Sequence, residues 1–182
     1  MCPSDATHDG GSLTNRENLT AANSYGITNY KLCSGSNWNW GQFVSSFTRG
    51  RNAGNAGRLE SPNGFRGRRS TAPITTRVAE IQDGLSNTFT AGEMVAGLCT
   101  HNAWYWFNGT TANAGVPLNH DVRNKVASTD WPNNYSFGSN RPGDGVFLMA
   151  DGAVRSVSEN IDLSGYRNLA TIDSGDATPA SN

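Results

Sequence analysis

Glycine and asparagine together make up 42 of the 182 residues, 21 of each. Both residue types interrupt helices and favour tight turns, because glycine adopts positive φ freely and asparagine tolerates it. No sustained apolar stripe with a period of 3.6 residues runs through the chain. These features exclude a long helical bundle and favour a turn-rich domain with a small core.

The remaining composition limits the class of protein and of partner. Hydrophobic residues reach only 36% and charged residues 16%, but seven Phe, five Trp and five Tyr argue against wholesale disorder. The net charge is -1, so no overall field recruits nucleic acid, and we interpret the seven arginines between positions 49 and 77 as a solvated loop. The length suits one domain, which we place at residues 1–172, followed by a polar tail at 173–182.

The clearest local signal is the pair Asp151 and Gly152 between two apolar runs, residues 146–150 and 153–157. Such a pair predicts a β-hairpin with a type I′ turn, in which both turn residues have positive φ. Further strands are expected at residues 25–32, 88–95 and 104–107, a short helix at 77–81, a loop from 110 to 134, and a helix at 163–170 capped by Asp162.

We therefore predict an α+β fold: a small twisted antiparallel sheet with long Gly/Asn-rich loops and one or two short helices. Two Asp-Gly pairs are predicted to be structural turns of this fold. They are Asp83 with Gly84, and Asp151 with Gly152.

Three cysteines occur, and an odd number permits at most one internal disulfide. A bridge between Cys2 and Cys33 would close a loop of about 30 residues and stabilise the fold by roughly 3–4 kcal/mol. No pair has C-x-x-C spacing, so no zinc site is expected. The Asp-Gly pairs at 83, 144 and 151 could supply calcium ligands, but turn chemistry explains each equally well. We expect no metal and no other cofactor, with calcium as the alternative.

No catalytic constellation is recognisable in the sequence. There is no G-x-S-x-G motif and no glycine-rich phosphate loop following a strand. We therefore expect a protein that is not an enzyme. A hydrolase built around His101 or His120 is a weaker alternative.

The tryptophans allow two interpretations. Trp38 and Trp40 lie two residues apart, as do Trp104 and Trp106, so on a strand each pair would share one face. Exposed pairs could stack on sugar rings and form a carbohydrate- or cell-wall-binding module with a polysaccharide partner. Buried pairs would fill the core of a domain that is short of aliphatic residues, and this interpretation is favoured.

Three segments resemble one bacterial family, the domain-of-unknown-function family 1559. The first is Cys-Pro-Ser-Asp at residues 2–5. The second is Ile-Gln-Asp-Gly-Leu-Ser-Asn-Thr at 81–88, followed by Gly-Glu at 92–93. The third is the block around Asp151 and Gly152, followed by Glu-Asn-Ile-Asp at 159–162. At the place where the family has a histidine upstream of that block, this chain has Arg141.

The resemblance implies a prepilin-like, type II secretion pseudopilin-like protein of planctomycete-type bacteria. Full-length relatives would be anchored by an N-terminal hydrophobic helix, and this chain would be the outer head without that helix. We therefore expect a non-enzymatic structural head located in the cell envelope or outside the cell. Its partners would be other pilin-like subunits or envelope components, as in a pilus-like filament or a secretion apparatus. This chain itself has no apolar run long enough to span a membrane.

Overall fold

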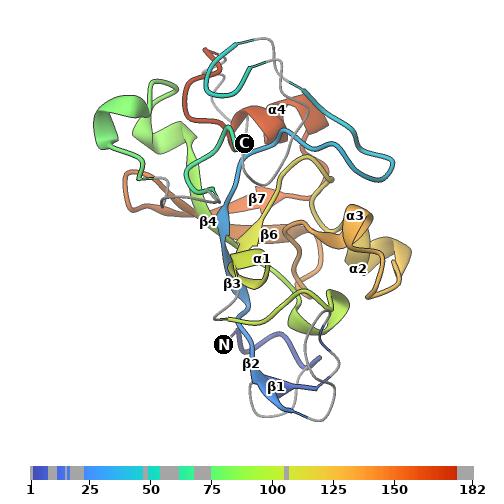
Figure 1. The fold of residues 1–182 in the computed structure, drawn as a ribbon. Coiled ribbons are helices and arrows are strands. Elements are labelled where there is room, and N and C mark those ends of the chain that lie inside the picture. Colours follow the sequence, from blue (N-terminus) through green and yellow to red (C-terminus); the bar gives the residue numbers. More distant parts are fainter. Residues whose placement is uncertain are drawn as a thin grey trace.

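A computed structural model describes residues 2–7, 12–14, 16, 23–46, 49–53, 62–67, 75–104 and 107–175 (Figure 1). Its strands are β1 (Ser12–Leu13), β2 (Tyr25–Gly26), β3 (Tyr30–Cys33), β4 (Phe89–Glu93), β5 (Thr111–Ala112), β6 (Asp144–Met149) and β7 (Val154–Ser158). Its α-helices are α1 (Phe107–Thr110), α2 (His120–Asn124), α3 (Trp131–Asn134) and α4 (Leu163–Asn168). Short 3₁₀ helices lie at Val78–Glu80, Leu85–Asn87 and Ala96–Leu98.

Five strands form the main sheet, in the order β5-β3-β4-β6-β7. β3 runs parallel to β5, and the other neighbouring pairs are antiparallel. β1 and β2 form a separate antiparallel pair. The α+β prediction is confirmed, but the sheet is mixed and more short helices are present than the one or two expected. β5 is only two residues long, and its parallel pairing with a strand nearly 80 residues earlier leaves no local sequence signal.

The hairpin of β6 and β7 forms where the Asp-Gly pair predicted it, but the turn is of another type. Only Gly152 has positive φ, +87°, so the predicted type I′ turn is wrong. The amide of Gly152 donates to the carbonyl of Met149 (3.1 Å), and the amide of Met149 donates to the carbonyl of Ala153 (2.8 Å). These bonds fit a type I turn followed by a glycine in the left-handed region, which is a common hairpin connection of three residues.

Replacing Gly152 with valine should destabilise the domain by about 1 kcal/mol or more, because a β-branched residue is strained at positive φ. A Cβ atom at this position would meet no atom within 4 Å, so crowding contributes nothing to the loss. Thermal unfolding measures the effect. Gly152→Asn is the control and should cost less, since asparagine tolerates this conformation. An unchanged melting temperature in the valine variant would contradict the turn.

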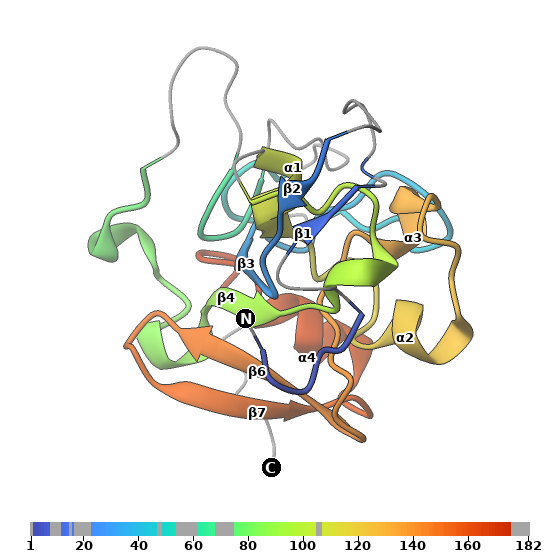
Figure 2. The ribbon, with the colours of Figure 1, turned by 90° about the horizontal axis from the view of Figure 1, so that it is seen from below.

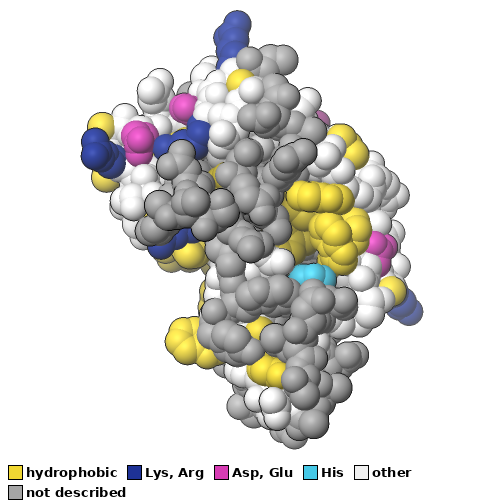
Figure 3. Space-filling view, viewed as in Figure 1, with side chains coloured by type: hydrophobic (Ala, Val, Ile, Leu, Met, Phe, Trp, Pro, Cys, Tyr) yellow, Lys and Arg dark blue, Asp and Glu magenta, His cyan; other side chains and the backbone are white. Residues whose placement is uncertain are grey.

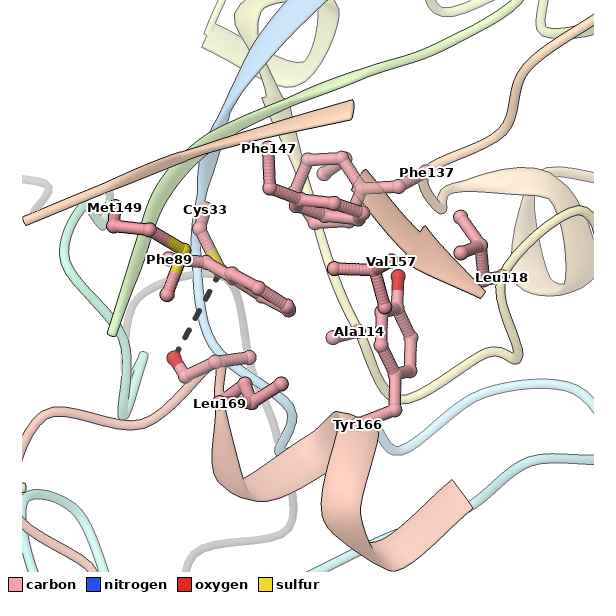
Figure 4. Close-up of a cluster of buried hydrophobic side chains, with 12 residues drawn as sticks. Cys33, Phe89, Ala114, Leu118, Phe137, Phe147, Met149, Val157, Tyr166 and Leu169 are labelled. Carbon is pink, nitrogen blue, oxygen red and sulfur yellow. Dashed lines mark hydrogen bonds between the residues drawn. The ribbon is translucent and has the colours of Figure 1, made fainter. Parts of the chain in front are cut away.

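The core lies on one face of the sheet, which we call the inner face, and α4 covers it (Figure 4). Phe147 of β6 stacks on Phe89 of β4 with ring centroids 4.1 Å apart. Tyr166 of α4 packs against both rings and is fully buried. The helix starts where predicted, because the carboxylate of Asp162 accepts a hydrogen bond from the amide of Gly165 (3.0 Å). The sheet and the helix are thus held together mainly by aromatic side chains.

Two parts of the sequence adopt structures other than those predicted. The expected strand at 104–107 is wrong at both ends, since Trp104 lies in a turn and Phe107 begins α1; residues 105–106 lie outside the described residues. The expected loop from 110 to 134 contains β5, α2 and α3. Each of these elements has five residues or fewer, so it carries too few positions for a periodic apolar pattern.

Candidate functional site

The opposite face of the sheet, which we call the outer face, carries an apolar row. Leu32, Ala91, Leu148 and Val154 are aligned across β3, β4, β6 and β7, because each is paired with the next in register. Leu148 is 41% exposed and Val154 is 69% exposed. In Figure 2 the N-terminal segment passes in front of one part of this face, whereas α4 lies behind the sheet. The sheet thus has one covered face and one partly open apolar face.

One end of the outer face is occupied by the N-terminal motif. Tyr30 pairs with Glu93 there, one row away from Leu32 and Ala91. The thiol of Cys2 donates a hydrogen bond to the Glu93 carboxylate, and the backbone amide of Cys2 donates to Asn29 Oδ1 (2.9 Å). The first described residues of the chain therefore lie beside the apolar row.

Asp5, the last residue of this motif, ties the N-terminal segment to the rest of the domain. Its carboxylate accepts hydrogen bonds from the side-chain amide of Asn29 and from the backbone amide of Ala96 (2.8 Å). Asp5 is 6% exposed and Asn29 is fully buried. Neither contact had a recognisable sequence signal, since the partners are separated by 24 and 91 residues.

Arg141 lies across the same end of the sheet and forms an ion pair with Glu93. Its Nη2 atom donates to both carboxylate oxygens, each at 3.0 Å. The hydrogen bonds and the negative charge of Glu93 raise the pKa of Arg141. Glu93 is 3% exposed, so the guanidinium neutralises a carboxylate that water does not reach. The resemblance places a histidine at this position, and in this chain arginine supplies a permanent positive charge.

Arg141→Ala should lower the free energy of unfolding by about 1–2 kcal/mol, because it leaves the buried Glu93 carboxylate without its cation. The loss is smaller than for a fully buried pair, since the Arg141 side chain is 43% exposed and solvent screens it. Urea unfolding at neutral pH gives the number. Arg155→Ala is the matched control on exposed β7 and should stay within about 0.5 kcal/mol of the wild type. Equal losses in both variants would contradict the assigned role.

The predicted disulfide between Cys2 and Cys33 does not form, and all three cysteines are free and buried. Cys2 contacts Glu93, which is paired with Tyr30 of β3. Cys33 lies three residues beyond Tyr30 on the same strand, and three strand residues span about 10 Å. A disulfide requires Cα atoms within about 7 Å of each other. Cys33 instead lies on the inner face near the carbonyl of Ala170, and burial raises its pKa to about 12.

Trp38 and Trp40 belong to an aromatic cluster rather than to an open platform. Trp38 is 1% exposed and stacks on Tyr135, with centroids 5.4 Å apart and planes inclined by 5°. Trp40 and Trp131 meet it edge-on. Trp38 is therefore buried, as the favoured interpretation expected, and the alternative of an exposed pair does not hold for it. The cluster reaches the surface beside α3, where Figure 3 shows a patch of hydrophobic side chains.

The second tryptophan pair is only partly described. Trp104 is 62% exposed, and its amide donates to the carbonyl of Gly26 (2.9 Å). A side chain at Gly26 would collide with the indole, whose Cδ1 atom would lie 2.8 Å from an added Cβ. Trp106 lies outside the described residues. Trp131 was not among the predicted binding residues. It lies four residues before Tyr135, and both rings contact Trp38.

The two Asp-Gly turns differ in their surroundings. Gly84 has φ of +96°, as a turn glycine does. Asp83 is 3% exposed, and its carboxylate accepts hydrogen bonds from the backbone amides of Ser174 (2.9 Å) and Gly175 (2.8 Å). Asp151 is exposed and accepts from the amide of Ala153 (2.9 Å). Asp83 therefore also fastens the C-terminal segment, a role that the sequence did not indicate.

The two histidines and the possible metal ligands are the remaining groups that could carry chemistry. His120 places its ring nitrogens 3.1 Å from the amide nitrogens of Gln42 and Asn124. His101 is buried, 6.0 Å from the Trp131 ring centroid. Within the described part of the chain, no three His, Cys, Asp or Glu side chains are grouped to hold a metal ion. No helix found among the described residues is long and apolar enough to cross a membrane.

These features define a small α+β domain whose sheet is covered on one face and where Cys2, Glu93 and Arg141 meet at one end of the other. A family model described as "Protein of unknown function (DUF1559)" matches residues 1–164. The chain belongs to this family, as the motif resemblance predicted. Comparisons with curated proteins and with solved structures each gave no match.

Proposed function

We propose that this chain is the non-enzymatic structural head of a pseudopilin-like protein, located in the cell envelope or outside the cell. The partly open apolar outer face is the observation that supports the proposal. A sheet that faces water on one side ordinarily alternates apolar residues inward with polar residues outward. Here Leu32, Ala91, Leu148 and Val154 put an apolar row on the outward side. Such a row is suited to packing against a second apolar surface.

The second surface would be an apolar helix. The resemblance implies an N-terminal hydrophobic helix in full-length relatives, and Cys2 lies beside the apolar row through its bond to Glu93. A helix joined to this end of the domain would meet the outer face directly. Other pilin-like subunits or envelope components would then contact the head in a filament or secretion apparatus. The proposal assigns no catalytic residue, no cofactor and no nucleic-acid partner to the chain.

Site-specific photocrosslinking of the protein in its native bacterium tests the proposal. A photoreactive amino acid at position 148 should crosslink to an apolar helix of the same protein or of another pilin-like subunit. The control is position 44, where Val44 is 58% exposed but belongs to no strand of the main sheet. Equal crosslinking from both positions, or no helical partner from position 148, would count against the proposal. A Leu148→Asp variant that assembles normally would also count against it.

A further inference from the structure

A separate group of titratable side chains is buried between β3, α2 and the segment around Cys99. Lys31 is 1% exposed, and its amino group lies 5.3 Å from the centroid of the Tyr135 ring. Asp121 of α2 is 1% exposed and Arg16 is 6% exposed. Cys99, Asp121 and Arg16 all interact electrostatically with the Lys31 amino group. None of these groups belongs to the outer face.

Several polar atoms of this region have no hydrogen-bond partner among the described residues. The donors without a partner are Lys31 Nζ and Arg16 Nε. The acceptors without a partner are Asp121 Oδ2, Asn102 Oδ1 and Asn134 Oδ1. Hydrogen bonds join the same segments, since Arg16 Nη1 donates to the carbonyl of Cys99 (2.7 Å) and Asn134 Nδ2 donates to that of Leu98 (3.0 Å). Buried polar atoms are almost always hydrogen-bonded, so this concentration needs an explanation.

The mixture of donors and acceptors indicates the class of ligand. An anion would satisfy only the donors, and a cation only the acceptors. Water both donates and accepts, and buried water typically makes about three hydrogen bonds to groups of this kind. We propose that Lys31 and Asp121 form a water-bridged ion pair in an internal hydration site bounded by Arg16, Cys99 and Asn134.

The proposed ion pair has a consequence for the response to pH. Burial raises the pKa of Asp121 to about 7. Hydrogen bonds from the backbone amides of Val122 and Asp121 oppose this rise, and the positive charge of Lys31 opposes it further. Burial lowers the pKa of Lys31. A raised carboxyl pKa contributes stability at low pH that is lost as the pH rises toward 7. The other titratable groups that interact with this pair are Arg16, Cys99 and, from α4, Tyr166. The free energy of unfolding is therefore coupled to the proton on Asp121.

Carboxyl ¹³C NMR of Asp121 tests the pairing in the intact chain. In Lys31→Met the midpoint of the Asp121 titration should rise by about one pH unit, because the carboxylate loses its nearby cation. Lys125 is the only other lysine and is exposed, so Lys125→Met is the matched control and should leave the midpoint unchanged. Equal midpoints in both variants would overturn the pairing.

Two measurements on the wild type complete the test, and they also decide the matter if Lys31→Met does not fold. The ¹⁵Nζ signal of Lys31 should titrate with a lower midpoint than that of Lys125. It should also show a second, smaller change in chemical shift at the pH where Asp121 titrates. A single titration with the same midpoint as Lys125 would overturn the proposal. A high-resolution crystal structure should contain water between Lys31 Nζ and Asp121 Oδ2. Direct contact of these two atoms, or an Asp121 midpoint that shifts when chloride replaces gluconate, would overturn the assignment to water.

Discussion

Phe147→Ala is expected to lower the free energy of unfolding by about 4 kcal/mol. Phe147 is 1% exposed, stacks on Phe89, and meets Phe137 edge-on at a centroid distance of 5.2 Å. Truncation removes a buried ring and leaves a cavity between the sheet and α4. Urea or thermal unfolding, followed by tryptophan fluorescence, gives the measurement.

The neighbouring residue on the same strand provides the control. Leu148 points to the outer face and is 41% exposed, so Leu148→Ala should cost less than about 1 kcal/mol in the isolated chain. The two variants differ in position by one residue, which in a strand changes the face. Comparable losses from both would show that the register of β6 has been assigned wrongly.

Asp83→Ala is expected to destabilise the domain by about 3 kcal/mol, because buried donors lose a charged acceptor. In addition to the amides of Ser174 and Gly175, the carboxylate accepts hydrogen bonds from the hydroxyls of Thr171 (2.9 Å) and Ser174 (3.2 Å). The C-terminal segment should loosen with the loss. Hydrogen exchange of the Ser174 and Gly175 amides measures that loosening directly, and chemical unfolding measures the total effect.

Asp151→Ala is the matched control, since Asp151 also precedes a turn glycine. Its carboxylate is exposed and accepts from one backbone amide, so the substitution should cost less than about 1 kcal/mol. If Asp151→Ala were as damaging as Asp83→Ala, the four-donor environment of Asp83 would not be the source of its effect. Faster exchange at Gly175 in the Asp151 variant would lead to the same conclusion.

The parts of the fold that could be predicted from the sequence are those with short-range signals. The hairpin at Asp151 and Gly152, the strand β4 and the capped helix α4 all depend on residues within a few positions of one another. The turn type was not predictable, because a type I turn followed by glycine and a type I′ turn share the same Asp-Gly pair. α2 and α3 were missed because each is little more than one turn long.

The candidate site was less predictable, because its contacts join distant segments. Glu93 has no charged partner nearby in the sequence, but folding brings it to Arg141, 48 residues later, and to Cys2, 91 residues earlier. Lys31 in a predicted strand would ordinarily be placed in solvent. The register instead places it on the inner face with Cys33, because Tyr30 and Leu32 occupy the outward positions.

The sequence by itself determined the α+β class, the family, the hairpin and the capped helix. The family follows from its motifs, and the hairpin and the helix follow because turn and cap energies depend on a few neighbouring residues. The tertiary structure decided which of two identical Asp-Gly pairs is buried, which tryptophan fills the core, and which face of the sheet stays open. Burial is a property of what packs from elsewhere in the chain, and the alternation of a strand defines two faces without saying which one will be covered.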